Sequence, residues 1–134
     1  MTSVTFRIWK PIGVSFACIL TCAVLGSLPG FGQVFTATVT GTVTDPSGEV
    51  VSAAKVILTN TGTNDTRTTS TGSNGKYTVS QLLPGSYELS AEAAGFRKYV
   101  QQGINLNAND TAELNVRLEV GSTSETIEVS GNVR

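Results

Sequence analysis

Apolar and polar residues alternate with a period of two along most of the chain that follows residue 33. In TATVTGTVTD the residues Ala37, Val39 and Val43 alternate with threonines, and in TAELNVRLEV every second residue from Ala112 to Val120 is apolar. Such alternation is typical of a β-strand with one buried face. No segment after residue 33 has the period of an amphipathic helix, so the pattern predicts an all-β fold.

Further short strands are predicted between these two segments. AAKVILTN places Val56 and Leu58 on one face, whereas DTRTTSTG is polar on both faces, which is typical of a sheet edge. Tyr77 and Val79 share the apolar face of the next strand. The residues predicted to point inward from the strands after it are Tyr87, Leu89, Ala91, Ala93, Val100, Ile104 and Leu106. Tyr99 lies on the face opposite Val100 and is therefore predicted to be an exposed aromatic residue.

Residues that favour tight turns separate the strands. The turn signals are Pro46 and Gly48 in DPSGEV, Asn74-Gly75 in SNGK, and Pro84-Gly85 in LLPG. Asn-Gly predicts a type I′ hairpin turn, because both central residues of that turn need a positive φ. About seven short strands with turn signals every eight to twelve residues predict an antiparallel β-sandwich. A meander barrel is the alternative, and the polar edge strand argues against it because a closed barrel has no edge.

The first 32 residues have the order of a secretory signal peptide. Arg7 and Lys10 precede an apolar run, and small residues follow the run. We therefore predict a signal-peptide helix over residues 1–32, with cleavage between Gly32 and Gln33. The alternatives are an uncleaved membrane anchor, for which the apolar run is short, and a lipoprotein acylated at a cysteine of the run.

The composition excludes several kinds of chemistry. Both cysteines, Cys18 and Cys22, lie in the leader, so cleavage leaves a chain without a thiol or a disulfide. The chain has no histidine, which excludes a Ser-His-Asp triad and the usual zinc ligand sets. A net charge of −1 gives no sign of a nucleic-acid-binding surface. We therefore predict no catalytic residue, no metal site and no cofactor.

Three weaker candidates are interpreted as ordinary surface features. Glu88 and Glu92 share a strand face, as solvated carboxylates on exposed strands do. Acidic residues lie near polar loops but lack the dense spacing of a calcium-binding loop; these are Asp45, Glu49 and Asp65. The NDT triplets at Asn64 and Asn109 match a glycosylation sequon, but the leader has a bacterial character.

Several motifs together resemble the carboxypeptidase regulatory-like domain, a transthyretin-like β-sandwich. They are GTVTDPSG, AAKVILTN, TGSNGKY, LLPGSYEL and AAGF, and the resemblance runs from about Val39 to Val120. It implies a single sandwich domain over residues 33–120. The residues to which we assign structural roles lie in these motifs: Gly41, Pro46, Gly48, Asn74, Gly75, Tyr77, Pro84, Gly85, Tyr87, Leu89, Gly95 and Phe96.

The resemblance does not carry every property of related proteins. The metallocarboxypeptidases that lend the domain its name keep their zinc site in a separate domain. Collagen-adhesin B-type repeats close a Lys–Asn isopeptide bond with the help of a buried acid. Here the inward position is Ala91, and the pattern identifies no acid on the face of Lys55, so no isopeptide bond is expected.

The last segment, residues 121–134, resembles the lead-in to the plug of TonB-dependent outer-membrane receptors. GSTS has the composition of a flexible joint, so this tail is predicted to be loosely attached. The resemblance implies a non-catalytic periplasmic module at the N-terminus of such a receptor, whole or truncated, whose partner is an outer-membrane barrel or plug. The alternative is a free secreted module that binds a glycan. Neither hypothesis involves a nucleic acid.

Overall fold

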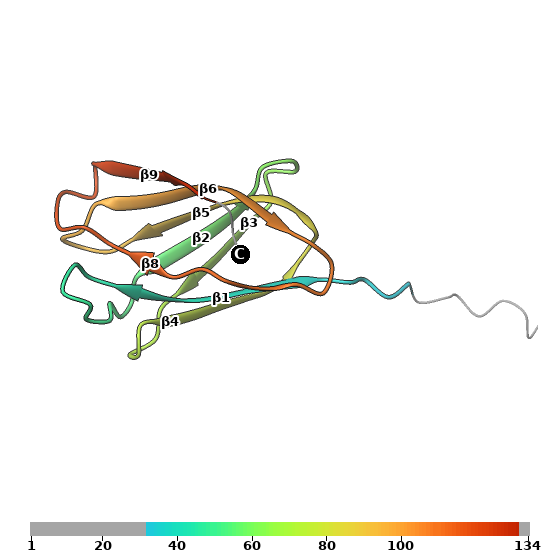
Figure 1. Cartoon of the computed structure of the whole chain (residues 1–134), viewed down its shortest axis with the longest axis horizontal. Coiled ribbons are helices and arrows are strands. Elements are labelled where there is room, and N and C mark those ends of the chain that lie inside the picture. The colour runs from blue at the N-terminus through green and yellow to red at the C-terminus, as the bar shows by residue number, and fades with distance from the viewer. Residues whose placement is uncertain (1–31, 132–134) are drawn as a thin grey trace, which may run out of the picture. The chain divides into compact units, whose positions relative to one another are not determined.

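In the computed structural model, residues 32–131 are described, and those from 34 onward belong to one compact unit. Nine strands are present, and no helix occurs among the described residues (Figure 1). The strands are β1 (Ala37–Thr44), β2 (Lys55–Asn60), β3 (Thr66–Ser70), β4 (Lys76–Leu82), β5 (Gly85–Glu92), β6 (Lys98–Leu106), β7 (Thr111–Glu113), β8 (Val116–Arg117) and β9 (Thr126–Ser130). The predicted signal-peptide helix lies outside the described residues.

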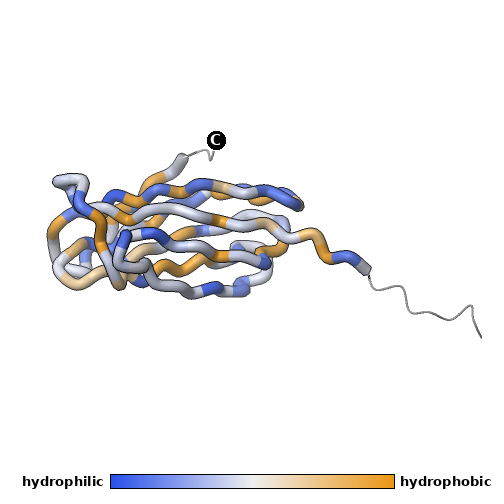
Figure 2. The backbone as a smooth tube through the Cα atoms, turned by 90° about the horizontal axis from the view of Figure 1, so that it is seen from below, coloured by the Kyte–Doolittle hydropathy of each residue, from blue (hydrophilic) through white to orange (hydrophobic). Residues whose placement is uncertain are grey.

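The strands form two sheets that face each other. One sheet has the order β4-β1-β7, with β8 also paired to β1, and the other has the order β3-β2-β5-β6-β9. The polar strand β3 lies at an edge, as its sequence predicted. Short apolar stretches alternate with polar ones along much of the tube (Figure 2). The prediction of a β-sandwich is thereby confirmed.

The core lies between the two sheets and is built from alternate residues of the strands. Val39 and Val43 of β1 and Val56 and Leu58 of β2 are all fully buried. Other large side chains buried in this core include Leu82, Leu89, Ile104, Val116 and Leu118. Burying each such side chain contributes about 1.5 to 3 kcal/mol relative to leaving it exposed. The apolar alternation therefore identified the core face of most strands correctly.

The predicted seven-stranded antiparallel arrangement is wrong in two respects. Strands β7 and β8 pair with β1 in parallel, and β9 pairs with β6 in parallel, so both sheets are mixed. In addition, the segment TAELNVRLEV does not form one strand. It keeps a single register along β1, Thr38 opposite Thr111 and Val43 opposite Val116, but is interrupted between them.

The interruption has a local cause at Gly41. The backbone N–H of Thr42 donates to the side-chain oxygen of Asn115 at 3.0 Å instead of to a carbonyl of the neighbouring strand. The Leu114 carbonyl turns toward Gly41 and accepts the Tyr77 hydroxyl at 2.7 Å. The predicted alternation continues past β8 to Leu118, which is buried, and ends before Val120, which is 69% exposed.

The Asn74-Gly75 turn is not the predicted type I′ hairpin. Gly75 has a φ of +68°, but Asn74 is not among the residues with positive φ. The N–H of Gly75 donates to the Gly72 carbonyl. This hydrogen bond closes a β-turn over residues 72–75, and Gly75 is its last residue. The strands on either side, β3 and β4, lie in different sheets. Pro84-Gly85 likewise joins β4 to β5 across the sheets, so both turns are corners of the sandwich.

A β-bulge in β6 changes which residues face the core. Opposite β5 the register shifts between Tyr87 and Leu89, and Gly103 has a φ of +75°. Because of this extra residue, Tyr99 shares the core face with Ile104 and packs against the core, contrary to the predicted exposure. Val100 is buried as predicted, but it pairs with Ser90 on the opposite face, outside the core cluster.

The tail forms an edge strand of the five-stranded sheet, and its loose attachment stays a prediction. Strand β9 pairs with β6 from Lys98 opposite Thr126 to Gln102 opposite Ser130. The segment before it is a turn closed by the Glu125 N–H, which donates to the Ser122 carbonyl at 3.0 Å. GSTS therefore forms a turn that positions an edge strand.

Candidate functional site

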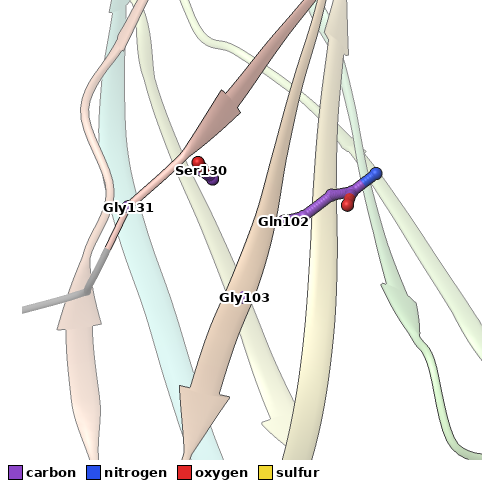
Figure 3. Close-up of a pocket in the computed structure, with 4 residues that line it drawn as sticks. All are labelled: Gln102, Gly103, Ser130 and Gly131. Carbon is purple, nitrogen blue, oxygen red and sulfur yellow. The ribbon is translucent and has the colours of Figure 1, made fainter.

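The depressions on the described surface are open and shallow. One of about 470 Å³ lies where β6 and β9 diverge, lined by Gln102, Gly103, Ser130 and Gly131. The side chain of Gln102 extends away from Ser130, and the two glycines contribute only backbone (Figure 3). A depression with so few side chains offers hydrogen bonding from the backbone and no acid–base pair.

A second depression, of about 310 Å³, is more polar. It lies on the outer face of the four-stranded sheet, where Thr40, Thr42 and Thr78 contribute to the lining. Lys76 and Glu113 lie on β4 and β7, the strands on either side of β1. The Glu113 carboxylate accepts a hydrogen bond from Asn115 Nδ2 at 3.0 Å, and the ion pairs of the described residues do not join it to Lys76. This surface can hold water or a hydroxylated molecule, but it has no pair of groups in proton-transfer contact.

The tyrosines do not form an exposed platform. Tyr77 and Tyr87 are each 3% exposed and belong to the core, as predicted. Tyr99 is partly buried against that core, and its hydroxyl donates to the Gln101 side-chain oxygen at 3.2 Å. Desolvation by burial raises the pKa of both Tyr77 and Tyr99. Among the described residues the aromatic side chain that is more than half exposed is Phe35, which precedes β1.

The Pro84-Gly85 corner is held by the tyrosine that follows it. The Tyr87 hydroxyl donates to the carbonyl of Leu83 at 2.7 Å. Gly85 lies against the side chain of Asn60, whose Nδ2 would be 3.0 Å from an added Cβ. Leu89 follows on the same face and is fully buried. These residues position the start of β5.

The DPSG turn is organised by Asp45. Its carboxylate accepts hydrogen bonds from the Ser47 hydroxyl at 2.6 Å and from the N–H groups of Ser47 and Glu49 at 2.9 Å. These donors, the Ser47 hydroxyl first, lower the pKa of Asp45. Gly48 has a φ of +91°, and the carbonyl of Pro46 accepts a hydrogen bond from Arg117. The carboxylate is therefore occupied by its own loop.

Other charged residues also have partners within the domain. Asp65 lies 3.6 Å from Arg67, and Glu92 lies 3.3 Å from Lys98. Lys55 is directly opposite Glu92 in the register of β2 and β5, so an acid does share its face, which the sequence pattern did not identify. Within residues 32–131 no three histidine, cysteine or acidic side chains are grouped as a metal site would require.

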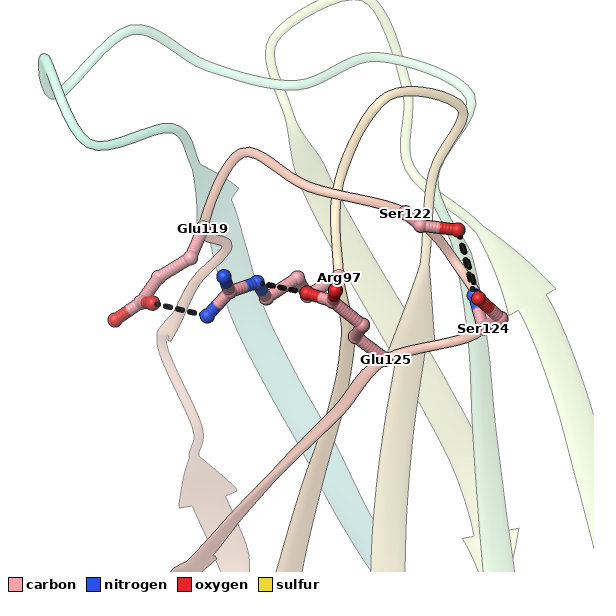
Figure 4. A network of polar contacts seen from close by, with 5 residues as sticks. All are labelled: Arg97, Glu119, Ser122, Ser124 and Glu125. Carbon is pink, nitrogen blue, oxygen red and sulfur yellow. Dashed lines mark hydrogen bonds and ion pairs between the residues drawn. The ribbon is translucent and has the colours of Figure 1, made fainter.

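One polar cluster was missed by the sequence analysis. Arg97 lies between Glu119 and Glu125, and its neighbours Gly95 and Phe96 contact the same segment (Figure 4). Gly95 has a φ of +84°, and Phe96 packs against the core and forms a bridge with Val120. The two acids lie more than twenty positions from Arg97 in the sequence, so no local pattern links them.

Along residues 32–131 the structure contains no helix with the length and apolar character needed to cross a bilayer.

Comparison with protein families identifies the domain. The model of the carboxypeptidase regulatory-like domain matches residues 38–119, which include both sheets except part of β1 and all of β9. The chain belongs to this family. It is also 32% identical over 127 residues to the TonB-dependent transporter Oar of Myxococcus xanthus, a match that covers 93% of this chain and 11% of that protein. The chain therefore spans about a tenth of the length of this relative.

Solved structures with the same fold have little sequence in common with the chain. Hydroxyquinol 1,2-dioxygenase from Pseudomonas putida superposes with a TM-score of 0.55 at 12% identity, over 68% of this chain and 58% of the enzyme. The TIE protein of Bacillus anthracis superposes with a TM-score of 0.55 at 19% identity, over 64% of this chain and 17% of that protein. At these identities the likeness shows the shared β-sandwich alone.

Proposed function

We propose that this chain is a non-catalytic, exported β-sandwich module that forms the N-terminal periplasmic domain of a TonB-dependent outer-membrane receptor. The observation that supports it best is the 32% identity to a TonB-dependent transporter over 93% of this chain. The signal-peptide pattern of residues 1–32, for which we predict cleavage between Gly32 and Gln33, supports export. The two depressions described above contain no acid–base pair in contact, which is consistent with a structural role.

The location of the domain is the testable part of this proposal. An antibody against the sandwich should detect the protein in the outer-membrane fraction of the native cells. Protease added to intact cells should leave the domain uncut, and protease added after the outer membrane is permeabilised should cut it. A surface protein and a soluble periplasmic protein serve as controls. Recovery of the domain from the culture medium would instead support the free secreted module.

Two further measurements refine the proposal. Intact-mass analysis of the exported protein should show Gln33 as its first residue, and retention of residues 1–32 would refute cleavage. Sequencing the DNA beyond the Arg134 codon should show a reading frame that continues into a plug and a barrel. A reading frame that stops there, in the native genome, would contradict the receptor assignment.

A further inference from the structure

Arg97 contacts both ends of the turn that precedes β9. Its Nη1 lies 3.7 Å from Glu119 Oε2, and its Nε lies 2.6 Å from Glu125 Oε2. The Nε–Oε2 contact is close enough for an ion pair, but it does not have the geometry of a hydrogen bond. Because Glu119 follows β8 and Glu125 precedes β9, one guanidinium joins the last segment of the four-stranded sheet to the last strand of the other sheet (Figure 4).

Backbone hydrogen bonds also join the segment around Arg97 to the turn that precedes β9. The N–H of Arg97 donates to the Glu119 carbonyl at 2.7 Å, and the N–H of Lys98 donates to the Glu125 carbonyl at 2.9 Å. The N–H of Gly121 donates to the Gly95 carbonyl at 3.1 Å. A Cβ on Gly121 would lie 2.5 Å from Arg97 Cγ, so the arginine stem lies directly against the turn.

Strand β9 itself buries little. Ile127 is half-buried, Val129 is 38% exposed, and the other three residues of the strand are exposed. The strand has five residues, lies at an edge and has a parallel ladder on one side only. Such a strand opens locally at a much lower free energy than the core strands. The pairing of β9 with β6 therefore depends on the turn that precedes β9.

We propose that Arg97 is a latch that sets whether β9 is docked on β6 or released as an extended tether. In the docked state the guanidinium bridges Glu119 and Glu125, and the chain leaves the sandwich in the direction of β6. In the released state the edge of β6 from Lys98 to Gln102 has no partner strand. Both carboxylates are more than half exposed, at 58% and 56%, so salt screens the latch and shifts the equilibrium toward release.

Amide hydrogen exchange of the exported protein tests the latch. Arg97→Gln keeps much of the stem and the backbone hydrogen bond but removes the charge. The amides of β9 that pair with β6 should then exchange about two- to fivefold faster, while Leu58 and Leu89 in the core should be unchanged. Arg97→Lys keeps the charge but reaches one acid at a time, so its effect should be intermediate.

Arg67→Gln is the matched control, because Arg67 also forms an exposed ion pair, with Asp65, on the opposite edge of the same sheet. It should leave β9 exchange unchanged. Raising the salt from about 0.05 M to about 0.5 M should speed β9 exchange in the wild type and not in Arg97→Gln. Unchanged β9 exchange in Arg97→Gln, an equal salt effect in both proteins, or faster exchange in every strand would each overturn the latch.

Discussion

The hydroxyl of Tyr77 donates a 2.7 Å hydrogen bond to the carbonyl of Leu114, two residues from opposite edges of the four-stranded sheet. The bond passes beneath β1 at Gly41, where a side chain would collide with both partners. It provides the turned Leu114 carbonyl with the donor that the interrupted strand does not supply. Buried carbonyl groups are almost always paired in this way.

Tyr77→Phe should therefore destabilise the domain although it keeps the aromatic ring. The Leu114 carbonyl would be left buried without its donor, which costs about 1 to 3 kcal/mol. Urea unfolding of the protein measures this. Tyr87→Phe is the comparison, because the Tyr87 hydroxyl bonds to a carbonyl in a partly buried turn, and its cost should be smaller. A larger cost for Tyr87→Phe would contradict the importance of the Leu114 contact.

Tyr77 should also make the free energy of unfolding depend on pH in the alkaline range. Burial, with a smaller contribution from Tyr99, raises the pKa of Tyr77 above its usual value of 10.0. The folded state therefore binds the phenol proton more tightly than the unfolded state does. The stabilisation of the folded state that results is fully present below pH 10, and it is lost as the pH rises through the raised pKa of Tyr77. The free energy of unfolding should fall less between about pH 9 and about pH 11 in Tyr77→Phe than in wild type. An equal fall in both proteins would show that Tyr77 does not titrate on unfolding.

Gly41→Ala should be far more damaging than its size suggests. The new methyl group would meet the Leu114 carbonyl and lie 2.8 Å from the ring carbon Cε1 of Tyr77. Both neighbours are fixed by their mutual hydrogen bond, so the strands must separate, at a cost of about 3 kcal/mol or more. Gly131→Ala is the control, because nothing lies within 4 Å of its added Cβ. Thermal melting compares the two, and similar melting temperatures would contradict the close approach.

Two glycines of the same end of the sandwich separate backbone strain from steric collision. Gly48 has a φ of +91° with open space around it, whereas Gly75 has a φ of +68° and an added Cβ would lie 2.6 Å from that of Val50. Gly48→Ala should cost about 1 kcal/mol from strain alone. Gly75→Ala should cost about 2 to 4 kcal/mol because strain and collision add. Equal losses in urea unfolding would show that Val50 moves aside freely.

Tyr87→Ala tests the predicted core anchor. Tyr87 is almost fully buried between the Pro84-Gly85 corner and Leu89, and truncating a buried aromatic residue costs about 3 to 5 kcal/mol. That is a large part of the stability of a small domain. A melting temperature within a degree or two of wild type would contradict the anchor role.

The sequence predicted the core faces well because one buried face imposes a strict period of two. Val39, Val56, Leu58 and Leu114 all lie where the alternation placed them. The errors occur where the period is interrupted. The bulge at Gly103 exchanges the two faces of β6, so Tyr99 turns inward and Val100 outward. Gly103 within a strand pattern was the available signal, because such a glycine often marks a bulge.

The pattern of apolar and polar residues did not predict which strands pair or whether they pair in parallel. The turns at Asn74-Gly75 and Pro84-Gly85 have hairpin composition, yet each joins strands of different sheets. A turn motif fixes the local chain path but not the sheet that the next strand enters. The cluster of Arg97, Glu119 and Glu125 arises only when the segments that follow β8 and precede β9 are placed beside the start of β6, so no spacing rule could have found it.

The position of β1 in the middle of its sheet has a consequence for how the domain forms. Its partners lie far along the chain, and the hydrogen bond from Thr42 to Asn115 spans 73 positions. Loops of that length must close before β1 is paired on both sides, so we expect slow folding with a high contact order. Until then the chain exposes ATVTGTVT, an uncharged stretch of high β-propensity. Such a segment is prone to intermolecular pairing during that interval, so aggregation during refolding should begin at β1.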